Sequence, residues 1–256
     1  MNKPGIYFVF TIFLLAGLST YGQDFSLGAR GGVSIPNLTA GGGDQNPLNT
    51  GYSSRFGADA GLFAEFKISK LFSLEPMLEY SSQGGKKDGL QALTTPAAFA
   101  ALFPAGQAPE YLYANYNSAA KLNYLLIPIL AKFGWNLKKS PWRIYVDAGP
   151  FLGILLSAKQ VTSGESELYT DPQGQQPLPA GQQSFNSTDD IKSQLNTINF
   201  GISGNIGIKY RFGKNGIFVE GGGNYGFLNI QKGSQNGKNN TGAATASIGY
   251  SLFFGK

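Results

Sequence analysis

Apolar and polar residues alternate along most of the chain, and glycine- and asparagine-rich stretches separate the alternating segments. In residues 54–69, every second position from Phe56 to Ile68 is apolar, and the positions between include Asp59, Glu65 and Lys67. A period of two is typical of a β-strand whose faces meet two different environments. The pattern therefore predicts an all-β protein.

Eight segments alternate in this way. We predict strands over residues 25–35, 54–69, 72–83, two within 121–159, 197–212, 217–230 and 243–254. The two strands within 121–159 are long and apolar, and they fold back on each other at the basic turn 136–141.

The connections between these strands are alternately long and short. Tight turns are expected at Ser69, Asn136 and Gly213, and long connections over residues 36–53, 84–120, 160–196 and 231–242. Outer-membrane barrels have short periplasmic turns, long outer loops and an even number of strands. Closure also gives each backbone N–H and C=O a protein partner in lipid. We therefore predict an eight-stranded antiparallel transmembrane up-and-down β-barrel.

The N-terminal segment has a different pattern. Lys3 precedes an apolar run over residues 6–18, and Thr20-Tyr21-Gly22 follows it. This order predicts a secretory signal peptide over residues 1–22, because a helix of this run reaches only about 20 Å against the roughly 30 Å of a bilayer core. Cleavage near Gly22 would leave residues 23–256 as one barrel domain with four long external loops. The expected location is the cell outer membrane.

Composition removes several function classes. The chain contains no Cys and no His. Disulfides, His-based catalytic triads and His- or Cys-containing zinc sites are therefore excluded. The 36 glycines and 13% aromatic residues are typical of curved β-structure, and the bases behind the net charge of +5 are scattered. We expect no cofactor, no metal and no nucleic-acid partner.

Charged residues fall on the strand faces opposite the apolar rows, and we predict that they point into the barrel. An eight-stranded interior is just wide enough for side chains to fill. The charges are therefore expected to pair into a plug, and the alternative is a gated or proton-conducting path along them. The predicted set is Arg30, Asp59, Glu65, Lys67, Glu75, Glu79, Lys132, Arg143, Asp147, Lys209, Arg211 and Glu220.

Aromatic residues cluster where the strands meet the tight turns. Amphipathic rings favour membrane–water boundaries, so we predict that Trp135, Trp142, Tyr210 and Phe212 lie at one. The last strand alternates through Ile248, Tyr250, Leu252 and Phe254. This row is similar to the C-terminal signal that the barrel-assembly machinery reads, and we expect that machinery and outer-membrane lipid as partners.

Two local features conflict with a simple barrel. Pro76, Pro128 and Pro150 lie within predicted strands and remove backbone donors, so we expect bulges or local breaks there. Residues 90–103 (LQALTTPAAFAALF) are apolar for an external loop. They could form a short helix over the barrel mouth, contact lipid or dock a partner.

Several segments together resemble the PorT-like outer-membrane β-barrel family. They are FSLEPMLEYSSQGGK (72–86), LNYLLIPILAKF (122–133), GPFLGILLSAK (149–159), GARGGVS (28–34) and INFGISGNIGIKY (198–210). Leu126 departs from the family, which commonly has Glu there. The resemblance implies an eight-stranded barrel in the outer membrane of a Gram-negative cell. It implies a link to protein secretion only through the family's namesake.

The sequence thus favours a non-enzymatic outer-membrane barrel with a charge-plugged interior. Such a barrel would act as a scaffold that presents its outer loops to a protein partner or surface ligand. The alternative is a narrow porin-like channel for small solutes. A barrel enzyme is disfavoured because the familiar outer-membrane hydrolases use a His.

Overall fold

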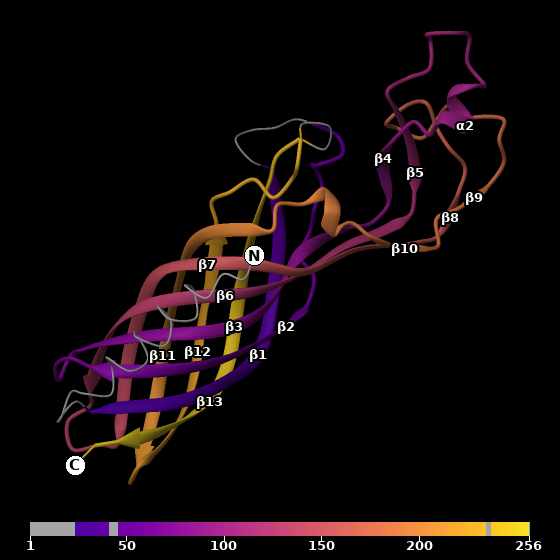
Figure 1. Cartoon of the computed structure of the whole chain (residues 1–256). Helices are drawn as coiled ribbons and strands as arrows, with labels where there is room; N and C mark the ends of the chain where they lie inside the picture. Colours follow the sequence, from indigo (N-terminus) through magenta and orange to yellow (C-terminus); the bar gives the residue numbers. More distant parts are fainter. Residues whose placement is uncertain (1–23, 41–45, 234–236, 256) are drawn as a thin grey trace, which may run out of the picture.

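The fold is a closed antiparallel barrel of eight strands (Figure 1), as predicted. The computed structural model describes residues 24–40, 46–233 and 237–255. Around the ring the strands are β1 (Phe25–Ala40), β2 (Gly57–Lys67), β3 (Phe72–Lys87), β6 (Asn117–Asn136), β7 (Trp142–Ser163), β11 (Ile198–Phe212), β12 (Asn215–Gly226) and β13 (Asn239–Phe254). The predicted signal peptide lies outside the described residues.

Closure is made by the first and last strands. β1 pairs with β13 from Phe25↔Phe254 to Ala40↔Asn239 without a register shift, and its other edge pairs with β2. Both edges of each barrel strand therefore have a partner, which removes the exposed edges that an open sheet would leave in lipid.

Several strand ends differ from the sequence prediction: β1, β3 and β13 extend further into the long connections, and β2 and β12 end earlier. β2 stops at Lys67 because the next two backbone N–H groups, of Ile68 and Ser69, both donate to Phe72 O in the tight turn. β12 stops at Gly226, and Ile230 packs into the interior instead of continuing the strand. β6 and β7 run beyond the predicted bounds and carry the two longest connections away from the barrel.

Each of the three prolines predicted to interrupt a strand coincides with a gap in one of its ladders, whereas Pro36 of β1 pairs with Ala243 in an unbroken ladder. Between Phe63↔Met77 and Phe66↔Leu74 the β2–β3 ladder skips two positions, which include Pro76, at unchanged register. The β3–β6 ladder skips Pro128 and the β6–β7 ladder skips Pro150 in the same way. The prolines thus produce local breaks, while the register shift in β6–β7 lies elsewhere, between Asn123 and Tyr124.

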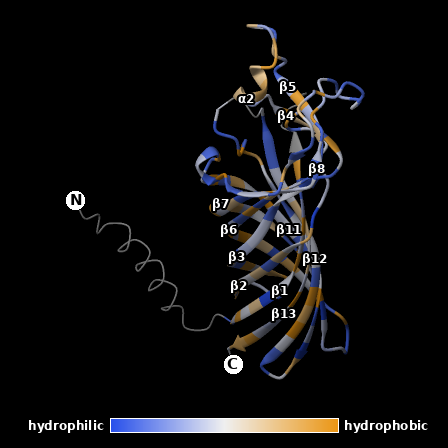
Figure 2. Ribbon diagram, turned by 90° about the vertical axis from the view of Figure 1, so that its right-hand side faces the viewer, coloured by the Kyte–Doolittle hydropathy of each residue, from blue (hydrophilic) through white to orange (hydrophobic). Residues whose placement is uncertain are grey.

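Exposure alternates along the strands as the two-residue period predicts. Leu62, Ile206 and Ile248 face outward with 64%, 61% and 65% of their surface exposed. Hydrophobic and hydrophilic positions alternate along the ribbon of the barrel in Figure 2. No α-helix in the part of the chain that the structure describes has the length and apolarity needed to cross a membrane.

A small folded unit, here named the lobe, stands beyond the long-connection end (Figure 1). It comprises residues 88–116 and 164–186, with β4 (Leu90–Thr94), α2 (Ala97–Ala100), β5 (Tyr111–Asn115), β8 (Glu165–Ser166) and β9 (Gln183–Ser184). β10 (Ser187–Asp190) then pairs with the end of β7, and the 3-10 helix η3 (Lys192–Gln194) follows.

The apolar segment 90–103 contributes to the lobe's own core. It forms β4 and the four-residue α2, and Leu93, Phe99 and Phe103 pack against buried Leu112 and Leu168. The lobe therefore explains the apolar character of this segment.

Candidate functional site: the barrel interior and its mouths

The centre of the barrel holds one arginine among three carboxylates. Arg30 Nη2 lies 2.9 Å from Glu79 Oε2 and 3.8 Å from Asp59 Oδ1, and Arg30 Nη1 donates to Glu220 Oε1 at 2.5 Å. The Arg30 side chain is 2% exposed. β1, β2, β3 and β12 supply these groups, so the cluster ties four strands together across the interior.

Two lysines complete the buried charges on the tight-turn side of this cluster. Lys132 Nζ donates to Glu75 Oε2 at 2.5 Å and lies 3.9 Å from Asp147 Oδ2. Lys209 Nζ donates to Glu65 Oε2 at 3.0 Å. We name these three bases and six acids the charge layer.

Aromatic rings separate the charges. Lys132 Nζ lies 4.2 Å from the centre of the Tyr145 ring, and Tyr145 Oη donates to Glu220 at 2.7 Å. Phe63 and Phe218 meet edge to face with ring centres 5.7 Å apart. These rings, with Met77 and Leu130, fill the space between the charged groups.

Glycines on neighbouring strands make room for the three rings. A Cβ at Gly28 would lie 2.2 Å from the Phe63 ring, and one at Gly249 would lie 2.1 Å from the Phe218 ring. A Cβ at Gly207 would lie 2.3 Å from the Tyr145 ring. The sequence shows these glycines but not which ring each one faces.

Nine of the twelve predicted interior charges are buried, and three lie elsewhere. Lys67 is 33% exposed, 3.7 Å from Asp24, and Arg143 and Arg211 lie at the tight-turn mouth. These three residues lie on the predicted faces of their strands, but their positions along the barrel axis place them at its rim. The buried set holds six acids and three bases instead of the predicted six of each.

The tight-turn mouth opens into a cavity of about 420 Å³. Arg143, Lys209, Arg211 and Phe253 line it, together with turn residues around Gly213. The Arg211 guanidinium lies 4.3 Å from the centre of the Phe253 ring.

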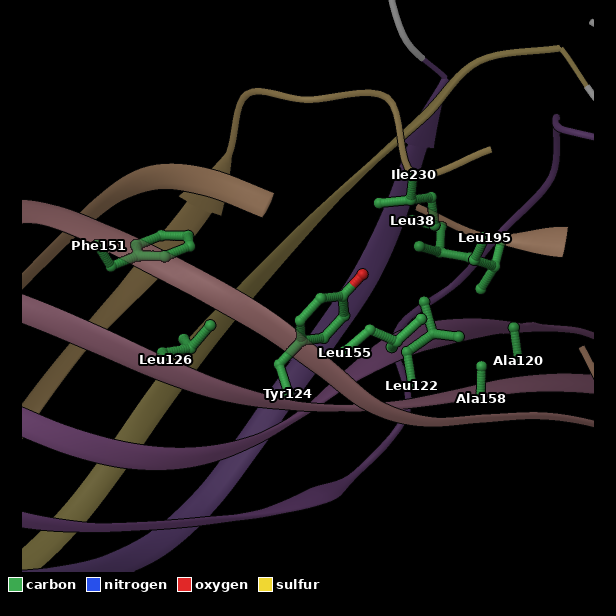
Figure 3. Packing of buried hydrophobic residues seen from close by; sticks show 10 residues of the cluster. All are labelled: Leu38, Ala120, Leu122, Tyr124, Leu126, Phe151, Leu155, Ala158, Leu195 and Ile230. Carbon is green, nitrogen blue, oxygen red and sulfur yellow. The ribbon is translucent and has the colours of Figure 1, made fainter. Parts of the chain in front are cut away.

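Toward the long-connection end, an apolar layer fills the interior (Figure 3). Large inward side chains of β6 and β7 meet residues from the long connections across the mouth. The layer consists of Leu38, Ala120, Leu122, Tyr124, Leu126, Phe151, Leu155, Ala158, Leu195 and Ile230. Tyr124, Leu122 and Leu155 are each 1% exposed. The interior is thus packed by an apolar layer as well as by charges, which the sequence prediction did not include.

The four predicted boundary aromatics gather on the outer surface at the tight-turn end. The rings of Trp142 and Tyr210 lie 4.9 Å apart, and those of Tyr210 and Phe212 lie 6.1 Å apart. Trp135 is 49% exposed on the neighbouring strand. Further ring pairs, Phe25–Phe254 and Phe72–Phe133, extend the same belt.

The predicted assembly row lies on the outer face of β13. Ile248, Tyr250, Leu252 and Phe254 are 65%, 45%, 37% and 38% exposed. Recognition of this row by the assembly machinery stays a prediction. Among the described residues, no group of three or more acidic side chains is arranged to hold a metal ion.

Comparison with known proteins gives a match to one family and to several solved folds. The family described as "Outer membrane protein beta-barrel domain" matches residues 20–232. Neisserial surface protein A shares 14% identity over 89% of this chain and 96% of that chain, with a TM-score of 0.41. OprG from Pseudomonas aeruginosa shares 10% over 92% and 97%, with a TM-score of 0.39. Ail, the attachment invasion locus protein of Yersinia pestis, shares 10% over 91% and 100%, with a TM-score of 0.37. No curated protein matches.

Proposed function

Because the chain belongs to the outer membrane protein β-barrel domain family, we propose that it is a non-enzymatic surface protein whose closed barrel holds a binding lobe outside the cell. The observation that carries this proposal is the lobe itself. A connection that only joins two strands needs no buried core, and long structured loops on a rigid scaffold are a common place for binding residues.

The lobe is built from two connections that are far apart in sequence. Tyr113 and Tyr169 exchange backbone hydrogen bonds of 2.9 and 2.8 Å, and the rings of Tyr116 and Phe185 stack with centres 4.4 Å apart. Leu112 is fully buried beneath them. These contacts hold the lobe in one shape, which lowers the conformational cost of binding a partner.

The packed interior supports a scaffold rather than a conduit. The apolar layer and the charge layer lie one after the other along the barrel axis, and the large residues of both are almost fully buried. A solute would have to displace side chains that are held by ion pairs and close packing.

The resemblance to the PorT-like family suggests the first partner to test, a component of a protein-secretion apparatus. A photoreactive amino acid would be placed at exposed Ala98 or Gln173 of the lobe, and at exposed Lys138 of the opposite turn as the matched control. We expect the same single partner to crosslink from both lobe positions in living cells and not from Lys138. No crosslink from the lobe, or the same product from all three positions, would contradict the proposal.

The alternative is a narrow porin-like channel for small solutes, and the unequal numbers of acids and bases in the charge layer favour it. The six carboxylates and three bases of the charge layer carry a formal charge of −3 if all are ionised. Current through the refolded protein in a planar bilayer separates the two functions, since only the channel conducts without a mutation.

A further inference from the structure

We propose that the cavity at the tight-turn mouth is a binding site for a phosphate group. This end of the barrel faces the periplasm in outer-membrane barrels. The cavity, of about 420 Å³, lies inside the ring of strands, beneath the charge layer. The proposal concerns the end opposite the lobe and is independent of the proposed surface function.

The lining of the cavity is basic. Five bases contribute to it, Lys67, Arg143, Lys209, Arg211 and Lys214, against the two acids Asp24 and Glu65. Full ionisation gives a formal charge of +3, from five positive and two negative groups.

The two acids are already paired. Lys209 donates to Glu65 at 3.0 Å, and Lys67 lies 3.7 Å from Asp24. Within the described residues, Arg143, Arg211 and Lys214 form no ion pair. Three positive charges therefore line one concave surface without a carboxylate in ion-pair contact with them.

Arg143 is held in position with one donor group left over. Its Nη1 donates to Lys70 O and to Asn136 Oδ1, both at 3.2 Å. Its Nη2 is buried and has no hydrogen-bond partner in the described part of the chain. A buried donor without an acceptor is costly, so a shift of the side chain that brings Nη2 to an acceptor of a ligand would stabilise it.

Gly134 creates the space for the Arg143 guanidinium. A Cβ at Gly134 would lie 2.3 Å from Nε and 2.6 Å from Nη2 of Arg143. The backbone of β6 is thus shaped to accept this side chain at the mouth.

Arg211 supplies the second guanidinium from the neighbouring strand β11. Its guanidinium lies over the Phe253 ring, and its Nε donates to Gly213 O at 3.4 Å. The contact fixes the side chain without a carboxylate partner. Two oriented guanidinium groups suit a phosphate group, because their remaining N–H groups can donate charge-assisted hydrogen bonds to its oxygens and a dianion offsets more of the charge than a carboxylate does.

The phosphate could belong to a soluble phosphate compound or to a lipid headgroup of the inner leaflet. Binding of inorganic phosphate would be measured by calorimetry with the full-length barrel in phosphatidylcholine nanodiscs. We expect saturable binding with one phosphate per barrel. A parallel sample with phosphatidic acid in the nanodisc separates the sources: loss of phosphate binding there assigns the site to the lipid, and retained binding assigns it to the soluble compound.

The variants Arg143→Gln and Arg211→Gln should each weaken phosphate binding at least about tenfold, since each removes charge-assisted hydrogen bonds. The double variant Lys138→Gln/Lys139→Gln is the matched control, because it removes two charges from the same end outside the cavity. It should bind within about twofold of the wild type, since exposed charges contribute little.

Gly134→Ala tests the geometry without changing the charge, and it should also weaken binding by displacing Arg143. Folding of every variant is checked first by its gel mobility with and without heating. The proposal is overturned if inorganic phosphate shows no saturable binding in either nanodisc sample and phosphatidic acid associates with the barrel equally well when Arg143 or Arg211 is replaced. Equal losses in the control and in the arginine variants overturn it as well.

Discussion

Replacing Arg30 by Met should destabilise the barrel strongly, because it leaves three carboxylates buried without their cation. Arg30 makes close contacts of 2.5 and 2.9 Å with Glu220 and Glu79 and a longer one of 3.8 Å with Asp59. Met retains most of the side-chain volume, so the loss is mainly that of charge and hydrogen bonds.

The magnitude follows from the two short contacts. A hydrogen bond to a charged group contributes about 1.5–3 kcal/mol, so two give about 3–6 kcal/mol. Removing one partner of a buried ion pair typically costs about 3–5 kcal/mol, which agrees. At about 1.4 kcal/mol per tenfold, the folding equilibrium constant should fall by roughly a hundred- to a ten-thousandfold.

The assay is urea unfolding of the protein in lipid vesicles, followed by the fluorescence of Trp135 and Trp142. Lys138→Met at an exposed turn is the matched control and should change the free energy of unfolding by less than about 0.5 kcal/mol. A change below about 1 kcal/mol for Arg30→Met would refute the view that these ion pairs hold the interior together.

Three further predictions follow from individual contacts. Gly28→Ala should lower the free energy of unfolding by about 1–3 kcal/mol, because its Cβ would lie 2.2 Å from the Phe63 ring. Gly31→Ala is the control, since a Cβ there has nothing within 4 Å, and it should leave the free energy of unfolding unchanged. Equal losses for the two variants in urea unfolding would contradict the view that Gly28 makes room for the Phe63 ring. Leu112→Ala should destabilise the lobe by about 2–5 kcal/mol and speed proteolysis there while the barrel persists; unchanged cleavage would argue against an independent lobe core. The Asp171 carboxylate accepts backbone N–H groups of Gln173, Gln175 and Gln176, which outweigh desolvation and hold its pKa below 3.8. Because the pKa of Asp171 is depressed in the folded state, the carboxylate stabilises the turn above pH 3.8, and this stabilisation is lost as the pH falls through the folded-state pKa. The amide chemical shifts of Gln175 and Gln176, followed against pH, should report this titration. A titration midpoint at or above pH 3.8 would contradict the prediction.

The sequence was sufficient to predict the strands and the two faces of each strand, because the two-residue period directly indicates which side chains point into the barrel and which point outward. Asp59, Glu79 and Lys132 are buried, as their positions in the pattern predict. The period does not record height along the barrel axis. Arg143 and Arg211 share the faces of buried residues but lie at the rim, since height depends on the stagger between strands.

Residues distant in sequence account for the features that the sequence did not reveal. The apolar layer needs Leu38, Leu195 and Ile230 to reach the inward residues of β6 and β7. The lobe needs Tyr113 to meet Tyr169 across two connections. Neither set of contacts produces a periodic pattern in the sequence, so the sequence predicts only loops for these connections.

The central claim, a closed barrel that acts as a scaffold, is tested most directly by ion conductance of the refolded protein in planar bilayers. A variant with Tyr124, Tyr145 and Phe151 replaced by Ala removes large side chains from both interior layers and serves as the comparison. The account predicts no current steps from the wild type and discrete steps from the variant. Steady conductance from the wild type would contradict it and establish the barrel as a narrow channel.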